Sequence, residues 1–490
     1  MTASASGVAG ARIARASQAV AGFVESLDAA MWRRLAVCVA LVQLAGVVVA
    51  VVDHVMLEAD GSQFVYAIAV GRPWLLVWQD ISVRPVAYAL TVAPTAWIAR
   101  ATHLTPMAIT ALYACIYYGT QLALFVAGCA LVWRRRPQLL VFPVATYAFA
   151  GVLEYGYPSE IVFAVGFLWI CLFLVERGRA MSLAALVCFI GLVFSHEFAA
   201  PSALIVAAAA MAREHGKAQG AWRVAAIAVV GVLSLGFVAA AHVMGGASGE
   251  VPLTAAVPVA LMAQDLAVWL VAIAAMVAGG IALAAPWFFA RKGAWWLTVV
   301  FWPALPLVLL NVPGVNFQHA LYPAGRTLLA IDMTAFAALF AIARFGDRSV
   351  APRPQPVAAR IAGPAVLASL ACGAGAALAF ASDFNTGLLG VERVAAHTPG
   401  RAPFALSLDD AFALMTPPEA AAARRLQLTW VSAYRSAILA DGAAPTHLVY
   451  VAYNAANYLT YCRRSAAIDP TRSAIPPVAL AEVRAYACAD

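Results

Sequence analysis

Long apolar runs separated by short polar connections dominate the chain. About 20 consecutive apolar residues are enough for a helix to cross a membrane. Eleven runs with this character are expected to be spans, at residues 35–56, 108–132, 138–153, 160–175, 180–196, 199–212, 222–242, 262–289, 294–311, 327–344 and 361–381. The pattern therefore predicts an all-α polytopic membrane protein with about 11 transmembrane helices.

The same pattern divides the chain into a basic leader, a transmembrane domain and a polar C-terminal region, at residues 1–34, 35–382 and 383–490. The C-terminal region mixes helical patterns with one strand-like run, at Leu408–Leu414, Ala420–Leu439 and His447–Tyr453. We expect a small mixed α/β unit there. The first apolar run follows a long polar lead, so we expect it to remain as a span and not to be cleaved as a signal peptide.

The composition agrees with a membrane protein. Hydrophobic residues make up 64% of the chain and charged residues 11%, whereas soluble domains carry about 25% charged residues. The net charge of +7 comes almost wholly from arginine, since Lys217 and Lys292 are the only lysines. The arginines lie between apolar runs, so we interpret them as topology signals and expect no nucleic-acid partner.

The connections differ in charge. The leader and one set of connections hold eighteen Lys and Arg residues, whereas the other set holds four, Arg72, Arg84, Arg100 and Arg326. The positive-inside rule then predicts a cytosolic N-terminus and, with eleven spans, an extracytoplasmic C-terminal region. Cys462 and Cys488 fall on this oxidising side, so a disulfide between them is expected.

The first extracytoplasmic loop, residues about 53–107, follows the first span and is rich in acids. Two semi-apolar helical patterns within it, Ser62–Val70 and Pro85–Ala99, are typical of helices that lie in the membrane interface. Glu58 and Asp60 stand one residue apart at its head, where they could serve as a general base or hold a divalent cation. The alternative is an acidic turn in which Gly61 ends the span.

Later outer connections carry further polar groups. Glu154, Tyr157 and Glu160 combine acids with aromatic rings, which suits a sugar site, although an interfacial tyrosine belt is the alternative. His196 and Glu197 share a tight turn and could bind a metal or relay a proton. A structural histidine is the alternative there. His319 is a weaker candidate in the last outer connection.

About eleven spans, a Glu-x-Asp pattern at the head of the first outer loop and interfacial helices in that loop resemble the polytopic GT-C glycosyltransferases. The string Asp60-Gly61…Tyr66…Ala69…Gly71…Arg84-Pro85 also resembles the bacterial branch of that superfamily. The resemblance implies transfer of a sugar from a polyprenyl-phosphate carrier to a glycan, lipid or protein acceptor, at the outer face of a bacterial inner membrane. It implies Asp60 as the base and Glu58 as its neighbour or a metal ligand.

The chain departs from that family in having no adjacent acidic pair, so Asp53, Glu58 and Asp60 all stay open as the base. The resemblance leaves a divalent metal, Mg²⁺ or Mn²⁺, optional, and Glu58, Asp60 and His196 are its possible ligands. Glycosyl transfer also needs a cationic partner for the departing phosphate, and guanidinium grips phosphate with paired donors. Arg84 and Arg326 are candidates, although Arg326 could instead be an interfacial anchor and Arg84 could pair with Asp80.

Two alternatives from other classes remain. A transporter or flippase of lipid-linked saccharides would need polar residues running through the spans, whereas here they gather at the outer ends. A polysaccharide polymerase or ligase would share the carrier lipid, but this chain has only Arg326 in its short late outer connection. No P-loop and no dinucleotide fingerprint occurs, so cytosolic nucleotide is not an expected energy source.

Overall fold

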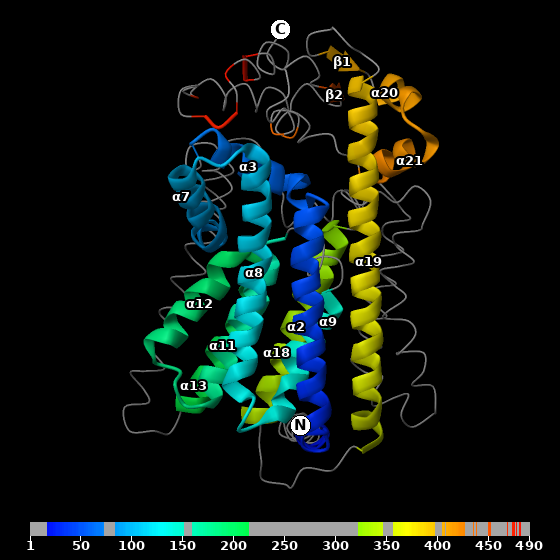
Figure 1. Cartoon of the computed structure of the whole chain (residues 1–490). Coiled ribbons are helices and arrows are strands. Elements are labelled where there is room, and N and C mark those ends of the chain that lie inside the picture. The colour runs from blue at the N-terminus through cyan, green and yellow to red at the C-terminus, as the bar shows by residue number, and fades with distance from the viewer. Residues whose placement is uncertain are drawn as a thin grey trace, which may run out of the picture.

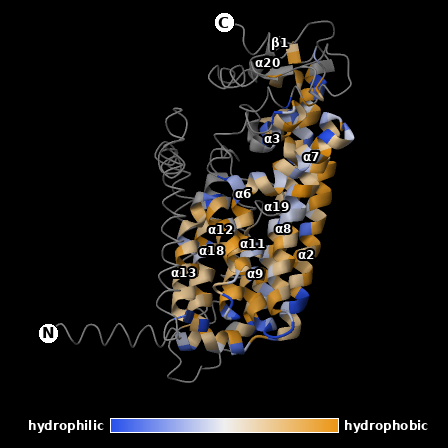
Figure 2. Cartoon of the chain, turned by 90° about the vertical axis from the view of Figure 1, so that its left-hand side faces the viewer, coloured by the Kyte–Doolittle hydropathy of each residue, from blue (hydrophilic) through white to orange (hydrophobic). Residues whose placement is uncertain are grey.

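The helices run side by side along one axis in the computed structural model (Figure 1). The structure describes residues 17–72, 84–150, 159–214, 322–345, 356–396, 404–406, 408–426 and 449–451, with single residues in the remaining C-terminal region. Hydrophobic residues follow the lengths of these helices, and hydrophilic residues gather toward both ends (Figure 2). The described part of the chain is thus mostly helical, as the apolar pattern predicts.

Helices with short 3₁₀ or π turns between them account for most of the described transmembrane domain. Their order is α2 (Ala29–Val52), η1 (Val55–Leu57), α3 (Ala59–Ala69), α6 (Pro85–Ala87), η2 (Tyr88–Val92), α7 (Ala93–Thr102), α8 (Pro106–Val132), η3 (Pro137–Leu140), α9 (Val141–Ala150), α11 (Ile161–Glu176), α12 (Leu183–Ser195), η4 (Glu197–Ala199), α13 (Ala200–Glu214), α18 (Tyr322–Phe345) and α19 (Pro356–Ala396).

Every predicted span within the described ranges contains one of these helices. Among the described residues, three helices are long and apolar enough to cross a membrane: α2, α8 and the part of α19 at Ala359–Val394. The predicted spans at 222–242, 262–289 and 294–311 lie outside the described residues, so eleven crossings stay a prediction. The loop patterns Ser62–Val70 and Pro85–Ala99 fold as helices, α3 and the continuous α6–η2–α7.

Several helices begin where the sequence supplies a cap. Asp28, Thr105 and Ser182 each accept a hydrogen bond from a backbone N–H in the first turn of α2, α8 and α12, from Ala30, Ala108 and Ala185. Such caps satisfy donors that the first turn of a helix leaves without partners. Pro106 follows the cap of α8 at a position where a missing N–H costs nothing.

The core centres on α11, which is buried from Ile161 to Val175 and packs against α8, α12, α13 and α18. Small residues let these helices approach closely. A Cβ added at Gly166 would lie 2.5 Å from Cβ of Leu124 on α8, and one at Gly191 of α12 would lie 2.6 Å from the Phe167 ring. Glycine is therefore required at both helix contacts.

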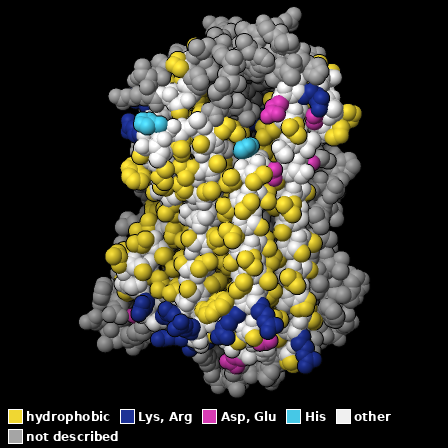
Figure 3. Space-filling model, in the orientation of Figure 1, with side chains coloured by type: hydrophobic (Ala, Val, Ile, Leu, Met, Phe, Trp, Pro, Cys, Tyr) yellow, Lys and Arg dark blue, Asp and Glu magenta, His cyan; other side chains and the backbone are white. Residues whose placement is uncertain are grey.

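Lys and Arg side chains form a band across the lower end of the molecule, beneath a broad hydrophobic belt (Figure 3). At this end Glu176 binds both Arg136 and Arg344, at 2.9 and 2.8 Å. The leader is also packed here, because Ser17 donates a hydrogen bond to the Ile342 carbonyl and Leu27 is buried. The described part of the leader, from Ser17 onward, thus packs against the helix bundle.

The described C-terminal elements lie at the opposite, upper end (Figure 1). They are β1 (Phe404–Leu406), α20 (Leu408–Leu414), α21 (Pro417–Leu426) and β2 (Val449–Val451), and β1 pairs with β2 in parallel. Helix α20 and strand β2 confirm the helical pattern at 408–414 and the strand-like run at 447–453. The predicted disulfide partners Cys462 and Cys488 lie outside the described residues.

Helix α19 connects the two ends. With 41 residues it is about 60 Å long, twice the thickness of a membrane core of about 30 Å. It continues past the predicted end of its span at residue 381, and α21 packs against its upper part. Arg393 of α19 holds Glu419 of α21 at 2.9 Å. One helix therefore carries the C-terminal elements on a rigid extension.

Candidate functional site

The acidic stretch at the end of α2 is a tightly folded turn. Asp53 caps the C-terminus of α2 and His54 takes a left-handed conformation, with φ of 52°. The chain then forms η1 and enters α3 at Glu58. A Cβ at Gly61 would lie 2.5 Å from the backbone oxygen of Met56, so η1 and α3 touch through a position that only glycine allows. This contact fixes the backbone that carries Glu58 and Asp60.

Glu58 is fully buried and faces an arginine from the C-terminal region. Its Oε2 lies 3.8 Å from Nη1 of Arg435, whose side chain is 4% exposed. Burial lowers the pKa of Arg435, and the negative charge of Glu58 opposes that shift. Glu58 occupies the N-cap of α3 without making a side-chain capping bond. Its carboxylate is therefore turned toward Arg435 and not toward its own helix.

Arg84 and Glu160, which are 76 positions apart in sequence, form an ion pair. Nη1 of Arg84 donates to Oε2 of Glu160 at 3.0 Å, and both side chains are largely buried. Arg84 directly precedes Pro85, which begins α6, and Glu160 directly precedes α11. The positive end of α11 also favours the carboxylate at this place. The expected partner Asp80 lies outside the described residues.

His196 and Arg326 form a second contact. His196 follows the last residue of α12 and is almost completely buried. Its Nε2 meets Nη2 of Arg326, which comes from the start of α18. On the other side of the ring, the backbone N–H of Phe198 donates to Nδ1 at 3.2 Å. The turn that the sequence singled out thus holds its histidine against the late outer arginine.

The contacts of His196 position the guanidinium of Arg326. A guanidinium can only donate, so its contact with Nε2 is a hydrogen bond when Nε2 is the acceptor, whereas the Phe198 N–H needs Nδ1 as the acceptor. A neutral imidazole has one acceptor nitrogen, so the tautomer decides from which of these two donors the ring accepts. In either tautomer the ring lies against Arg326, and a guanidinium held in place suits the oxygens of a phosphate.

The two contacts lie on neighbouring elements. Helix α6 follows Arg84 and packs against α12. His196 directly follows the last residue of α12. The turn η4 after His196 contacts both α11, which follows Glu160, and α18, which carries Arg326. The structure therefore brings four of the predicted site residues, Arg84, Glu160, His196 and Arg326, to one end of the bundle.

Ser159 adds a further polar group to this end. It directly precedes Glu160, is fully buried, and its hydroxyl has no hydrogen-bond partner among the described residues. A buried hydroxyl without a partner is uncommon in proteins and marks a place that suits a polar ligand or water. Sequence inspection did not single out Ser159, because a serine before a helix reads as an ordinary cap.

The divalent metal that the resemblance leaves optional does not fit Glu58 or His196. Glu58 has the guanidinium of Arg435 beside it, and His196 has that of Arg326. A metal ion at either place would lie next to a cation, which repels it. Within the described residues, no group of three or more His, Cys, Asp or Glu gathers closely enough to hold a metal. We therefore derive no step through a metal.

The remaining predicted residues are placed only partly or not at all. Asp60 lies in the first turn of α3 and Glu197 lies in η4, but their side chains lie outside the described part. Glu154, Tyr157 and His319 also lie outside it. Arg435 was missed by sequence inspection, since one arginine in a helical pattern among many carries no sign that it is buried.

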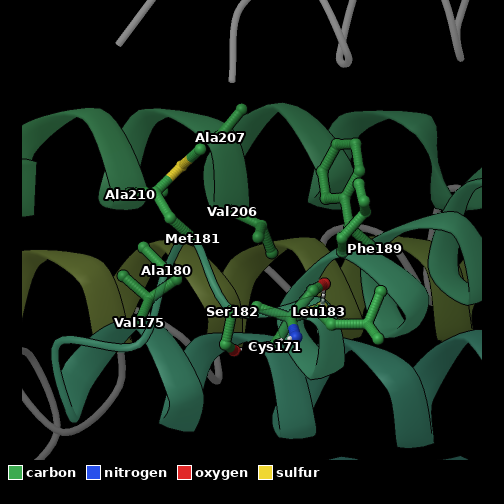
Figure 4. A pocket seen from close by; sticks show the side chains of 12 residues that line it. Cys171, Val175, Ala180, Met181, Ser182, Leu183, Phe189, Val206, Ala207 and Ala210 are labelled. Carbon is green, nitrogen blue, oxygen red and sulfur yellow. Dashed lines mark hydrogen bonds between the residues drawn. The ribbon is translucent and has the colours of Figure 1, made fainter. Parts of the chain in front are cut away.

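A cavity of about 180 Å³ lies between α11, α12 and α13, at the end where the basic connections lie. Its lining is apolar apart from Cys171 and Ser182, and Met181 and Leu183 lie along its wall (Figure 4). Such a lining suits an aliphatic chain and offers nothing to a sugar or a phosphate. The cavity is therefore separate from the charged residues of the upper end.

Comparison with known proteins and structures finds no relative of the chain. No protein-family model, no curated protein and no solved structure matches the chain.

Proposed function

We propose that the protein is an integral membrane glycosyltransferase that moves a sugar from a polyprenyl-phosphate carrier to an acceptor at the upper end of the bundle. The Arg326 guanidinium, positioned by its contact with His196, carries this proposal, because guanidinium donors suit an oxyanion such as the phosphate of the carrier. The Arg84–Glu160 pair and the buried Ser159 hydroxyl on neighbouring elements support it.

The reaction can be written with the residues of this end. An acceptor hydroxyl attacks the anomeric carbon of the sugar, and the bond from that carbon to the phosphate oxygen breaks. The proton of the hydroxyl passes to the Asp60 carboxylate, which we propose as the general base. Arg326, which His196 positions, stabilises the negative charge that grows on the departing phosphate. Arg84 precedes α6, which packs against α12, and we propose that it contributes to the same charge.

The base and the phosphate site are separate in this scheme. Glu58 is held by Arg435, which favours Asp60 over Glu58 as the group that accepts the proton. Glu160 neutralises Arg84 before the donor binds and positions its guanidinium. The donor sits with its lipid tail along the hydrophobic belt, and the acceptor approaches from the side of the C-terminal region.

Transfer is tested with purified protein, polyprenyl-phosphate sugars and a set of glycan, lipid and peptide acceptors. We expect polyprenyl phosphate to be released only when an acceptor is present. Asp60→Asn should lower kcat by about 100-fold or more, since general bases contribute that much. Arg326→Met should lower kcat/KM by a similar factor, and Arg326→Lys should restore part of it. Unchanged turnover in Asp60→Asn and Glu58→Gln would show that the site is misassigned.

Transport of lipid-linked saccharides without chemistry is the second candidate. It is favoured by polar side chains buried within helices, Gln121 of α8 and Asp332 of α18. Neither amide atom of Gln121 has a hydrogen-bond partner among the described residues, which is costly inside a membrane unless the group serves a pathway. Liposomes that hold the protein and a labelled lipid-linked sugar decide between the two. Movement of the label across the bilayer without sugar transfer would favour the transporter.

A further inference from the structure

The C-terminal region is built into the main hydrophobic core. Ile438 and Ile475 are fully buried, and with Leu480 they belong to the same core cluster as the residues of α2, α8 and α11. These three residues come from separate positions in the last part of the chain. Burial of apolar side chains from both partners is the main favourable term in such packing. The region is therefore held against the bundle at several points.

The same region contacts both ends of α3. At the N-terminus of the helix, Arg435 faces Glu58 at 3.8 Å. At the C-terminus, the backbone N–H of Ala474 donates to the carbonyl of Ala69 at 2.7 Å. The helix has 11 residues and is about 16 Å long, so the two contacts are separated by its full length. The C-terminal region thus holds α3 at its two ends.

The contact at Glu58 is the stronger constraint because it is charged and buried. Both side chains are almost completely removed from solvent. Breaking a buried ion pair by removing one partner usually costs more than the pair contributes. Glu58 and Arg435 therefore stabilise each other. Movement of the C-terminal region away from α3 would separate the two charges.

We propose that Arg435 is a positioning residue, which reaches from the C-terminal region to hold Glu58 and thereby sets the place of α3, whose first turn carries Asp60. The inference rests on the proposed function, in which Asp60 accepts the proton of the acceptor. It adds that the C-terminal region is docked on α3 during transfer. The reaction therefore depends on a residue about 375 positions away in the chain from the base that it serves.

The test uses the full-length protein and two measurements. Hydrogen exchange reports the protection of the amides of residues 59–69, and kinetics report kcat and KM for a polyprenyl-phosphate sugar. In Arg435→Met we expect exchange of these amides to rise about tenfold or more. We expect kcat to fall about tenfold or more while KM for the donor changes less than about twofold, since Arg435 acts through Glu58 and α3 in this proposal and not through the donor. Arg435→Lys keeps the charge and should recover part of both.

Two further variants make the result decisive. Arg393→Met removes the ion pair with Glu419, which also lies in the C-terminal region, and should leave the exchange of residues 59–69 unchanged. The double variant Glu58→Gln with Arg435→Met leaves no buried charge at this contact. It is measured in place of Arg435→Met if that single variant does not fold. We expect it to show the same loss of protection and of kcat.

Several outcomes would overturn the proposal: wild-type protection and kcat in both Arg435→Met and the double variant, an equal effect of Arg393→Met, or no recovery in Arg435→Lys. The proposed function fails separately, when the wild-type protein transfers no sugar from any donor. In that case the exchange experiment still decides whether Arg435 holds α3.

Discussion

Buried charge at the upper end of the molecule occurs in partnered groups. Arg84 faces Glu160, Arg326 faces His196, and Arg435 faces Glu58. A charge without a partner near a membrane is costly, so such groups are kept only where they are compensated or used. Each group joins residues that are far apart in sequence. At the residue scale, the upper end therefore holds two arginines that carboxylates compensate, Arg84 and Arg435, and Arg326, which faces a histidine and which a phosphate could engage.

Gly61 gives a prediction at this scale. Gly61→Ala places a Cβ 2.5 Å from the Met56 backbone oxygen, and backbone cannot move aside as a flexible side chain can. We expect a loss of about 1–3 kcal/mol in the free energy of unfolding, measured by denaturant or heat in detergent. Gly119→Ala is the matched control, since a Cβ there meets nothing within 4 Å. It should be neutral or stabilising, because alanine favours a helix over glycine. Equal effects of the two substitutions would contradict the tight turn.

Helix ends at the lower side are tied by Glu176. This residue ends α11 and binds Arg136, which precedes η3, and Arg344 in the last turn of α18. Arg344 at a helix C-terminus is also favoured by the helix dipole. Three elements that are distant in sequence thus meet at one carboxylate. At the element scale, this contact sets the register of α11 against α18.

Glu176→Gln should weaken this junction. The amide keeps the shape of the side chain but loses both charged contacts, and we expect a loss of about 1–3 kcal/mol in the free energy of unfolding. Thermal unfolding in detergent at low and at high salt measures it. At high salt the difference in stability between the wild-type protein and Glu176→Gln should become smaller, since Arg136 is half exposed and salt screens its contact with Glu176. Arg135→Gln is the control, because that exposed arginine forms no ion pair with the residues that the structure describes. A change in Arg135→Gln as large as in Glu176→Gln would argue against the junction.

The whole molecule has two chemically different ends. Arginines gather at the lower end, whereas α3, the charged groups and the C-terminal elements lie at the upper end (Figures 1 and 3). The contacts of Glu58 with Arg435 and of Ala69 with Ala474 show that the acidic stretch and the C-terminal region share one end. Helix α19 extends well beyond the thickness of a membrane to reach it.

The orientation in the membrane gives a prediction at this scale. An alkaline phosphatase fused after Asp490 should be active, because the enzyme folds only on the oxidising side and the positive-inside rule puts the arginine-rich end in the cytosol. A fusion after Arg177, at the basic end, should be inactive. A green fluorescent reporter at the same two positions should give the reverse result. An inactive phosphatase after Asp490 would show that the C-terminus is cytosolic and that the predicted orientation is wrong.

The amino-acid sequence by itself determined the apolar helices, their approximate bounds and the unequal charge of the two ends. These features are local, because hydrophobic runs, capping residues and glycine positions act within a few turns of chain. The helical pattern at Leu408–Leu414 and the strand within His447–Tyr453 were confirmed for the same reason.

Only the tertiary structure decided which charges meet. Arg84 pairs with Glu160 across 76 positions and His196 meets Arg326 across 130, while Arg435 reaches Glu58 from the far end of the chain. Nothing in local sequence distinguishes a buried arginine from one that faces water. Partner choice follows from how the helices pack, which depends on the whole core, and so Arg84, Glu160, His196 and Arg326 were named from the sequence but their pairing was not.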